Sequence, residues 1–405
     1  YENPDMRLSL SEMKLVWRPA ELWQRMLHIN ELSSRQIQFE WRKQADDTPS
    51  EPVVLSDIKL PLGIRLDQAS VRNVQIIGGP DAAPVVIQEL NLSADWTRDG
   101  LNLSTLELTM PEASLQGKGK LNPVNDYPLE LTTDILLTME GVPGFRAAGR
   151  IAGDLQRLEI KQELTGDVAA SVSADLESVL QELKWKLKLN LAQLPKEYLP
   201  AEIPANLTLD LTGNGDLDQG RVDMQVRLPE GKAPATGKAG APAPPPTLDL
   251  TASSRFSDLS FDLLGNWKNM QWPLAGSPQY VSSKGEFKLT GNADDYRFSL
   301  SGDISGTDIP QGKLLANGKG NTEQIILEDL QGDMLEGKLG LTGTVNWKPV
   351  VSWQAQIDAT GINPGVMAPE WPGKLNLSAT SSGQIKDEKL LLDAELKQLD
   401  GTLRD

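Results

Sequence analysis

The sequence predicts an all-β protein, a long antiparallel meander curled into an open trough with an apolar interior and one or two short helical turns. Apolar and polar residues alternate along most of the chain, which is the period of a strand with one apolar and one polar face. Corners rich in glycine and proline separate these runs. Long connections are scarce, so we expect consecutive strands to pair with each other.

The clearest element is the segment 337–361, GKLGLTGTVNWKPVVSWQAQIDATG. Leu339, Leu341 and Val345 lie at alternate positions before a short corner at 346–349. The alternation resumes after that corner, so the segment predicts a hairpin whose two strands present apolar side chains to one side. Other parts of the chain repeat this pattern, as repeats that must cover an apolar face by stacking do.

Taken in order, the first elements are two strands, a helical turn and a third strand. The alternation slips by one residue near Ser11 and Glu12, which predicts a bulge or turn there. Residues 19–25, PAELWQR, predict a helical turn with proline at a tolerated first-turn position. A strand follows through Phe39, and residues 44–52 are a polar loop containing prolines.

The rest of the chain continues as strands. Residues 173–182 suit a strand followed by a turn, and KWKLKLN at 184–190 is an unambiguous strand. Residues 230–247 form a low-complexity loop of Pro, Gly and Ala, which we interpret as an insertion at one turn of a continuous sheet more readily than as a domain linker. We therefore expect a membrane-proximal unit at 1–50, a first stretch of trough at 53–229, the loop at 230–247 and a second stretch at 248–405.

Charge and composition exclude several classes of protein. The 405 residues carry a net charge of −17, so no basic stripe is present to bind nucleic acid. The chain has no cysteine, and no run of about 18 apolar residues predicts a membrane-spanning helix. The chain begins at Tyr1, already inside a strand pattern, so we expect an upstream segment that held a signal or an anchor.

No catalytic constellation is evident. His28 is the single histidine, and its place on the polar face of a strand favours a solvated or structural role over that of a catalytic base. Asp294 and Asp295 lie in a turn sequence, GNADDYR. The sequence contains neither a nucleotide-binding loop nor an EF-hand loop. We predict that the protein is not an enzyme and uses no metal and no cofactor.

The apolar face needs a cover, since each buried Leu contributes roughly 1.5–3 kcal/mol. A dry sandwich core, a membrane barrel and an open trough would each provide one. Strands of roughly five to eight residues disfavour the barrel, and sequential hairpins favour the trough, although a dry core stays open as the simpler alternative. The predicted lining residues are Leu101, Leu103, Leu129, Leu131, Trp185, Leu187, Leu189, Leu207, Leu209, Leu211, Leu339, Leu341, Val345, Trp347, Trp353, Ile357, Leu375 and Leu377.

Several segments carry a family resemblance, namely NWKNMQWPLAG from Asn266, KGEFKLTGNADDYRFSLSG, and EDLQGDMLEGKLGLTGTVNWKPVVSWQAQIDATGINP. They resemble the bacterial TamB proteins of the AsmA-like superfamily. The opening LSLSEMKLVWRPAELWQRMLHINEL is similar to the membrane-proximal unit of that superfamily. The resemblance implies a β-taco fold in the periplasm of a Gram-negative bacterium. It also implies an inner-membrane anchor helix and a C-terminal domain that contacts the outer-membrane barrel TamA, both absent from this sequence.

Two functions are compatible with these observations. A continuous apolar trough suits the acyl chains of phospholipids, which the resemblance links to transport from the inner to the outer membrane. A chaperone-like scaffold that offers sheet edges to unfolded outer-membrane proteins is the alternative. A polysaccharide-binding solenoid is a weaker third, since it calls for exposed aromatic platforms and the alternation places most Trp on the apolar face.

Overall fold

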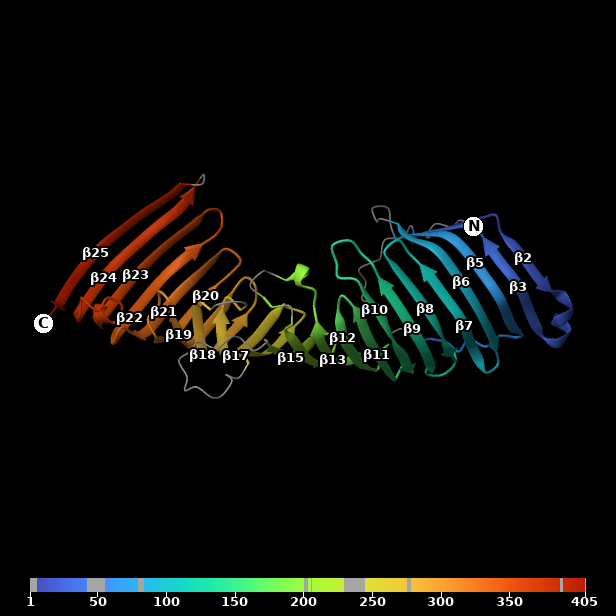
Figure 1. The fold of residues 1–405 in the computed structure, drawn as a ribbon. Coiled ribbons are helices and arrows are strands. Elements are labelled where there is room, and N and C mark those ends of the chain that lie inside the picture. Colours follow the sequence, from blue (N-terminus) through green and yellow to red (C-terminus); the bar gives the residue numbers. More distant parts are fainter. Residues whose placement is uncertain are drawn as a thin grey trace. The chain divides into compact units, whose positions relative to one another are not determined.

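The computed structural model describes residues 6–41, 55–78, 84–199, 203–204, 206–228, 245–274, 278–386 and 389–404. In these residues it contains 25 strands and three short 3-10 turns, and the sheet is open, since its strands do not close on themselves (Figure 1). The predicted all-β class is therefore confirmed. The chain divides into two compact units, Tyr1–Tyr198 and Leu199–Asp405. The finer domain boundaries expected from the sequence stay a prediction, and the loop at 44–52 lies outside the described residues.

The first unit begins with a long hairpin. Its outer arm is β1 and β2, its inner arm is β3 and β4, and η1 lies at the bend. Glu12, with a φ of 49°, interrupts the outer arm, so the irregularity predicted near Ser11 and Glu12 is confirmed. It is a break between β1 and β2 and not a bulge, because Ser11 opposite Gln36 and Lys14 opposite Ser33 keep the same register. The bounds are β1 Met6–Ser11, β2 Lys14–Arg18, η1 Pro19–Gln24, β3 Met26–Ser34 and β4 Gln36–Trp41.

The pairing of this hairpin with the next strand departs from a simple meander. Both β3 and β4 pair with β5 in parallel, with Met26 opposite Gly63 and Ile37 opposite Val74. From β5 to β13 every consecutive pair is antiparallel. The bounds are β5 Gly63–Ile77, β6 Val85–Thr97, β7 Gly100–Thr109, β8 Ala113–Leu121, β9 Leu129–Leu137, β10 Phe145–Gly153, β11 Arg157–Gly166, β12 Ala169–Glu177, β13 Lys184–Gln193 and η2 Lys196–Tyr198.

The second unit is an uninterrupted antiparallel meander. Each strand from β14 to β25 pairs with the next, and the predicted hairpin is β22 and β23. β15 and β16 pair directly, although the proline-rich segment lies between them in the sequence. The bounds are β14 Thr208–Gly215, β15 Gln219–Arg227, β16 Thr247–Arg255, β17 Ser260–Trp272, β18 Tyr280–Gly291, β19 Tyr296–Gly306, β20 Gly312–Gly320, β21 Gln324–Met334, β22 Gly337–Asn346, β23 Val351–Ile362, η3 Pro364–Val366, β24 Gly373–Lys386 and β25 Lys389–Leu403.

Most strands are longer than the sequence pattern suggested. β5 and β25 each have 15 residues and β24 has 14. The reason is that β-bulges absorb the phase slips, as between Leu103 and Leu106 and between Leu327 and Leu330. A bulge shifts the alternation by one residue while the strand continues, so a slip in the sequence does not mark the end of a strand.

Each unit is a single layer without a covered core. The buried hydrophobic residues among those described are few and mostly small, and no large side chain is less than 2% exposed. The accessible surface is 26305 Å² for a 44.2 kDa chain. A compact protein of this mass would expose roughly 15,500 Å². The sheet therefore keeps both of its faces accessible.

Candidate functional site

The strand registers collect the apolar alternate residues on one face of each unit, because directly opposite residues lie on the same face of an antiparallel pair. In the first unit, Leu101 lies opposite Leu121, which in turn lies opposite Leu129. Leu131 lies opposite Gly119 on the same face as Leu103. We call this surface, and its counterpart in the second unit, the apolar face.

The same rule places the remaining predicted lining residues of the strands. Trp185, Leu187 and Leu189 on β13 lie opposite residues of the apolar face of β12. Predicted residues of the second unit lie on its apolar face too, opposite apolar or small residues of neighbouring strands: Leu209, Leu211, Leu339, Leu341, Val345, Trp353, Ile357, Leu375 and Leu377.

Two predicted lining residues lie just outside the strands. Leu207 precedes β14 and is 8% exposed, so it is buried instead of lining an open surface. Trp347 follows β22 and binds the turn between β20 and β21. Its backbone N–H donates to the carbonyl oxygen of Glu323 at 3.0 Å, and its Nε1 donates to that of Thr322 at 2.8 Å. Trp347 therefore fastens a corner of the sheet.

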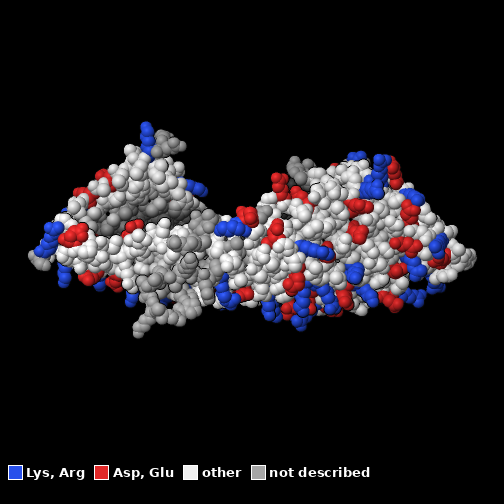
Figure 2. Space-filling view, in the orientation of Figure 1, with Lys and Arg blue, Asp and Glu red and all other residues white. Residues whose placement is uncertain are grey.

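The apolar face curves inward. Ala316 and Ala359 are only 4% and 3% exposed, although no second layer covers them. Each of these small residues lies between two leucines, one directly opposite it on each neighbouring strand. Figure 2 shows the second unit hollowed on the side that β20–β25 curve around, and the visible surface of this hollow is mostly uncharged. Larger residues of this face remain open, with Val345 43% exposed. The face is thus a groove and not a closed core.

Aromatic rings in the second unit lie flat over glycines of neighbouring strands. A Cβ built on Gly383 would lie 2.3 Å from the Trp353 ring, and one built on Gly285 would lie 1.9 Å from the Trp267 ring. Trp353 Nε1 also donates to Ser381 Oγ at 3.2 Å, which holds the ring down on the sheet. Phe287 and Phe298 cover glycines of adjacent strands in the same way. These stacks give the groove a low, smooth floor.

The sequence did not reveal these stacks. The pattern of corners predicts glycines mainly in turns between strands, whereas Gly265, Gly285, Gly318 and Gly383 lie in strand interiors beneath a ring. The alternation in the sequence does contain a sign of the stacks, because glycines such as Gly343 and Gly383 occupy positions of the apolar face where a larger apolar residue is expected. A glycine in a strand interior often marks a place where another group approaches the backbone closely.

One polar contact interrupts the apolar face of the first unit. Gln162 lies on this face, opposite Gly149 and Val172. Its Nε2 donates to Thr133 Oγ1 at 2.9 Å across Gly149, and its Oε1 is buried without a hydrogen-bond partner. An unpaired buried acceptor is costly, so Gln162 is a weak point in an otherwise apolar lining.

His28 has a structural role and is not solvated. The sequence had left both possibilities open. It is 5% exposed, its Nδ1 lies 2.9 Å from Glu21 Oε2, and its Nε2 lies 2.8 Å from Asp67 Oδ2. Hydrogen bonds to Glu21 and Asp67 raise the pKa of His28, and the bond from His28 lowers the pKa of each carboxylate. The imidazolium therefore ties η1 to β3 and β5, with Arg18 and Asn30 completing the network.

The described part of the chain shows little arrangement of side chains for other chemistry. No group of three or more His, Asp or Glu side chains is arranged there to hold a metal ion. The helical turns in the same residues are too short to cross a membrane. Asp294 and Asp295 belong to a turn, as expected, because the side chain of Asn292 accepts both of their backbone N–H groups.

The fold and the groove define a class of protein, namely single-layer β-sheets whose apolar face stays open. The model of the TamB N-terminal domain matches residues 41–239 and 246–405, and the chain belongs to that family. It is also 25% identical over 361 residues to the translocation and assembly module subunit TamB of Haemophilus influenzae, which covers 88% of this chain. The chain spans 23% of the length of that relative. No solved structure matches the chain.

Proposed function

We propose that the apolar face conducts phospholipids between the two membranes of a bacterial envelope, with the acyl chains in the groove and the headgroups toward solvent. The observation that carries this proposal is an apolar face in each unit that has no covering layer and whose larger residues stay partly exposed. Such a surface is unstable in water unless a ligand covers it.

The energetics favour acyl chains as that ligand. Each CH₂ removed from water contributes about 0.8 kcal/mol, so two chains of about 16 carbons bring on the order of 25 kcal/mol. A groove with an apolar lining on every strand offers an acyl chain many positions of nearly equal free energy. The chain can slide between these positions without leaving an apolar environment. The flat rings over Gly285 and Gly383 remove obstacles along that path.

In this proposal the protein lies in the periplasm. A segment upstream of this sequence anchors it in the inner membrane, and a downstream domain contacts a TamA-like barrel in the outer membrane. The sequence described here would then be the part nearer the inner membrane.

Neighbouring residues of β22 provide a matched test. Leu341 lies on the apolar face and Thr342 on the polar face. We expect the purified protein to carry phospholipid in native mass spectrometry, Leu341→Asp to lose most of it, and Thr342→Asp to keep it. Both variants should retain the circular dichroism spectrum of a β protein. Equal lipid in both variants, or none in the unmodified protein, would refute the proposal.

A second function, a scaffold for the assembly of outer-membrane proteins, is favoured by the name of the relative, a translocation and assembly module subunit. A photo-crosslinking residue in place of Ile357, on the apolar face of β23, distinguishes the two in cells. Capture of phospholipid supports conduction, and capture of unfolded outer-membrane proteins supports the scaffold.

A further inference from the structure

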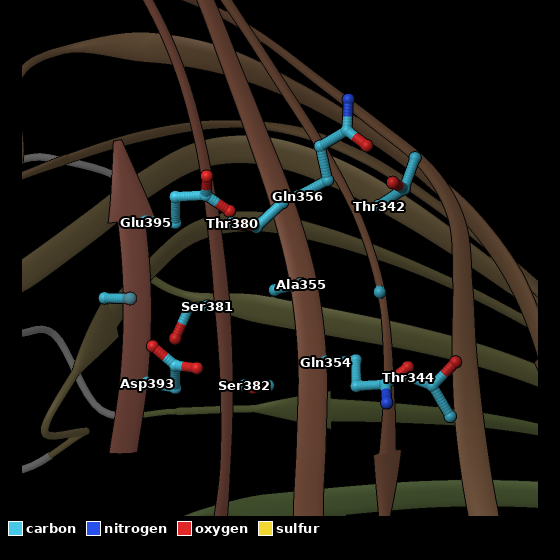
Figure 3. Close-up of a pocket in the computed structure, with 12 residues that line it drawn as sticks. Thr342, Thr344, Gln354, Ala355, Gln356, Thr380, Ser381, Ser382, Asp393 and Glu395 are labelled. Atoms are coloured by element: carbon cyan, nitrogen blue, oxygen red, sulfur yellow. The ribbon is translucent and has the colours of Figure 1, made fainter. Parts of the chain in front are cut away.

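The polar face of β22–β25 contains a furrow that runs across the strands. Its two walls are rows of directly opposite side chains. One wall consists of Thr342, Gln356, Thr380 and Glu395. The other consists of Thr344, Gln354, Ser382 and Asp393. Figure 3 shows the two rows on either side of the gap, which has a volume of about 690 Å³.

The floor of the furrow is backbone. Between the rows lie Gly343, Ala355, Ser381 and Ala394, whose side-chain positions belong to the apolar face. The bond from Trp353 Nε1 to Ser381 Oγ confirms that Ser381 points to that other face. A ligand in the furrow therefore approaches the sheet closely between two lines of polar groups.

A second hollow of about 540 Å³ continues the furrow on one side. It shares the wall of Thr344, Gln354, Ser382 and Asp393. Its other border is a further row of opposite amide and hydroxyl side chains, formed by Gln324, Asn346, Ser352 and Gln384. Three parallel polar rows thus cross β22–β24. The third row begins on β21, and its position on β25 is occupied by the apolar Leu391.

The chemistry of these rows differs from the rest of the polar face. Elsewhere that face is held by ion pairs such as Arg146–Asp134 and Arg227–Asp210, and the last of them among the described residues is Lys319–Glu328. Around the furrow, neutral amides and hydroxyls replace the charged pairs. The side chains of Thr342 and Thr380 make no hydrogen bond to any part of the chain that the structure describes.

Rows of hydroxyls and amides suit a neutral ligand that carries many hydroxyl groups, because the hydroxyls of Thr342 and Thr380 are free to bind it. Gln356 already donates to Asp358, and Asn346 donates to Ser352, so these two amides offer their remaining donor and acceptor sites. Neither Lys nor Arg lines the furrow or the second hollow, and Asp393 and Glu395 at one end of the furrow repel anionic polymers. An apolar chain would leave the rows unpaired. A carboxylate accepts two neighbouring sugar hydroxyls well, since it offers two oxygens and about four acceptor sites.

The spacing of the rows narrows the ligand to a linear chain. Neighbouring strands lie about 4.8 Å apart, so each row repeats at that interval. The repeat of an extended β-linked pyranose chain is close to this value, whereas α-linked glucans coil. A β-linked glycan in the furrow would place about one sugar over each strand.

From this geometry we infer that the polar face of β22–β25 binds a linear, neutral, β-linked glycan, which lies across the strands on the face opposite the lipid groove. Ligand and lipid then occupy opposite sides of the same strands. The binding acts through hydrogen bonds, without the exposed aromatic platforms of many sugar-binding surfaces.

Replacing threonines with valine tests this inference because valine keeps the shape and the strand preference while it removes the hydroxyl. We expect chitohexaose or cellohexaose, titrated into the protein by NMR or calorimetry, to bind at millimolar concentration or better. The triple variant Thr342→Val, Thr344→Val and Thr380→Val should bind at least tenfold more weakly. Thr132→Val, an exposed polar-face threonine of β9, is the matched control and should bind as before.

The remaining outcomes contradict the inference. Absence of binding by both β-linked hexamers overturns it, and so does equal binding of maltohexaose, or an undiminished affinity in the triple variant. Thermal unfolding of each variant shows whether a loss of affinity reflects a loss of fold. The phospholipid content is measured on the same samples and tests the lipid groove separately. The glycan result and the phospholipid result therefore decide the two proposals independently.

Discussion

The stack of Trp353 on Gly383 gives the most direct prediction about the groove. A methyl group at position 383 would lie 2.3 Å from the Trp353 ring, so Gly383→Ala must lift the ring off the sheet or shift the strands. Gly340 on β22 faces the polar side, and a methyl group there would meet nothing closer than a carbonyl oxygen of Asp358 at 3.7 Å. Gly340→Ala is therefore the matched control.

Gly340→Ala should stabilise the protein, whereas Gly383→Ala should not. A glycine in a strand interior costs about 0.5–1 kcal/mol relative to alanine, so Gly340→Ala should raise the free energy of unfolding by that amount. Gly383→Ala gains the same contribution and loses about 1–3 kcal/mol to overpacking, which leaves it neutral to about 2.5 kcal/mol less stable. Urea unfolding followed by circular dichroism measures both.

A lifted ring should also obstruct the groove. We expect Gly383→Ala to retain less phospholipid than Gly340→Ala. A second change, Trp353→Leu, should restore only part of the lost stability, because it removes the clash with the ring and leaves the carbonyl oxygen of Leu391 at 2.7 Å from the new methyl group. If Gly383→Ala proves as stable as Gly340→Ala and binds as much lipid, the ring does not lie on Gly383 in solution and the description of the groove floor is wrong.

Three further predictions concern other parts of the chain. His28 has a raised pKa, so its ion pairs stabilise the fold fully below the usual value of about 6.5 and lose that contribution as pH rises through the folded pKa. Between pH 6 and pH 9 the urea midpoint of the unmodified protein should therefore fall, and that of His28→Gln should fall less. NMR of the single histidine should show a pKa above 6.5. A pKa at or below 6.5 would contradict the network. Gln162→Leu removes a buried, unpaired oxygen and should raise the free energy of unfolding by about 1 kcal/mol, whereas a loss of that size would show that the oxygen has a partner in solution. Replacing residues 229–244 with Asn-Gly shortens the connection between the paired β15 and β16 roughly fourfold, which should add about 1.2 kcal/mol, and unfolding of the chain instead would argue that this segment belongs to the fold.

The alternation of the sequence was sufficient to predict which residues share a face, because side-chain direction in a strand depends only on residue parity between bulges. Leu101, Leu187 and Leu341 therefore fell on the expected faces. Alternation was not sufficient to predict strand length, since a bulge and a strand end both shift the alternation of apolar and polar residues by one position. It also gave no information on which strand pairs with which over a long connection, so the parallel pairing of β3 and β4 with β5 was missed.

The furrow and the ring stacks depend on neighbours that the sequence does not place together. Trp353 and Gly383 are remote in sequence, and their contact follows only from the register of β23 with β24. The polar rows of the furrow likewise need four registers at once. His28 meets Asp67 only because β3 lies beside β5, whereas its bond to Glu21 spans a single turn.

The single-layer fold explains why a charge on the apolar face can distinguish a groove from a core. In a closed core an unpaired carboxylate is buried, which costs several kcal/mol or more and unfolds most proteins. On the apolar face Val345 already keeps 43% of its surface exposed, so an aspartate in place of Leu341, which lies two apolar-face positions away on the same strand, can reach water without disrupting the sheet. The loss should then fall on the ligand, whose acyl chain would lie against a charge, while the strands on both sides stay paired.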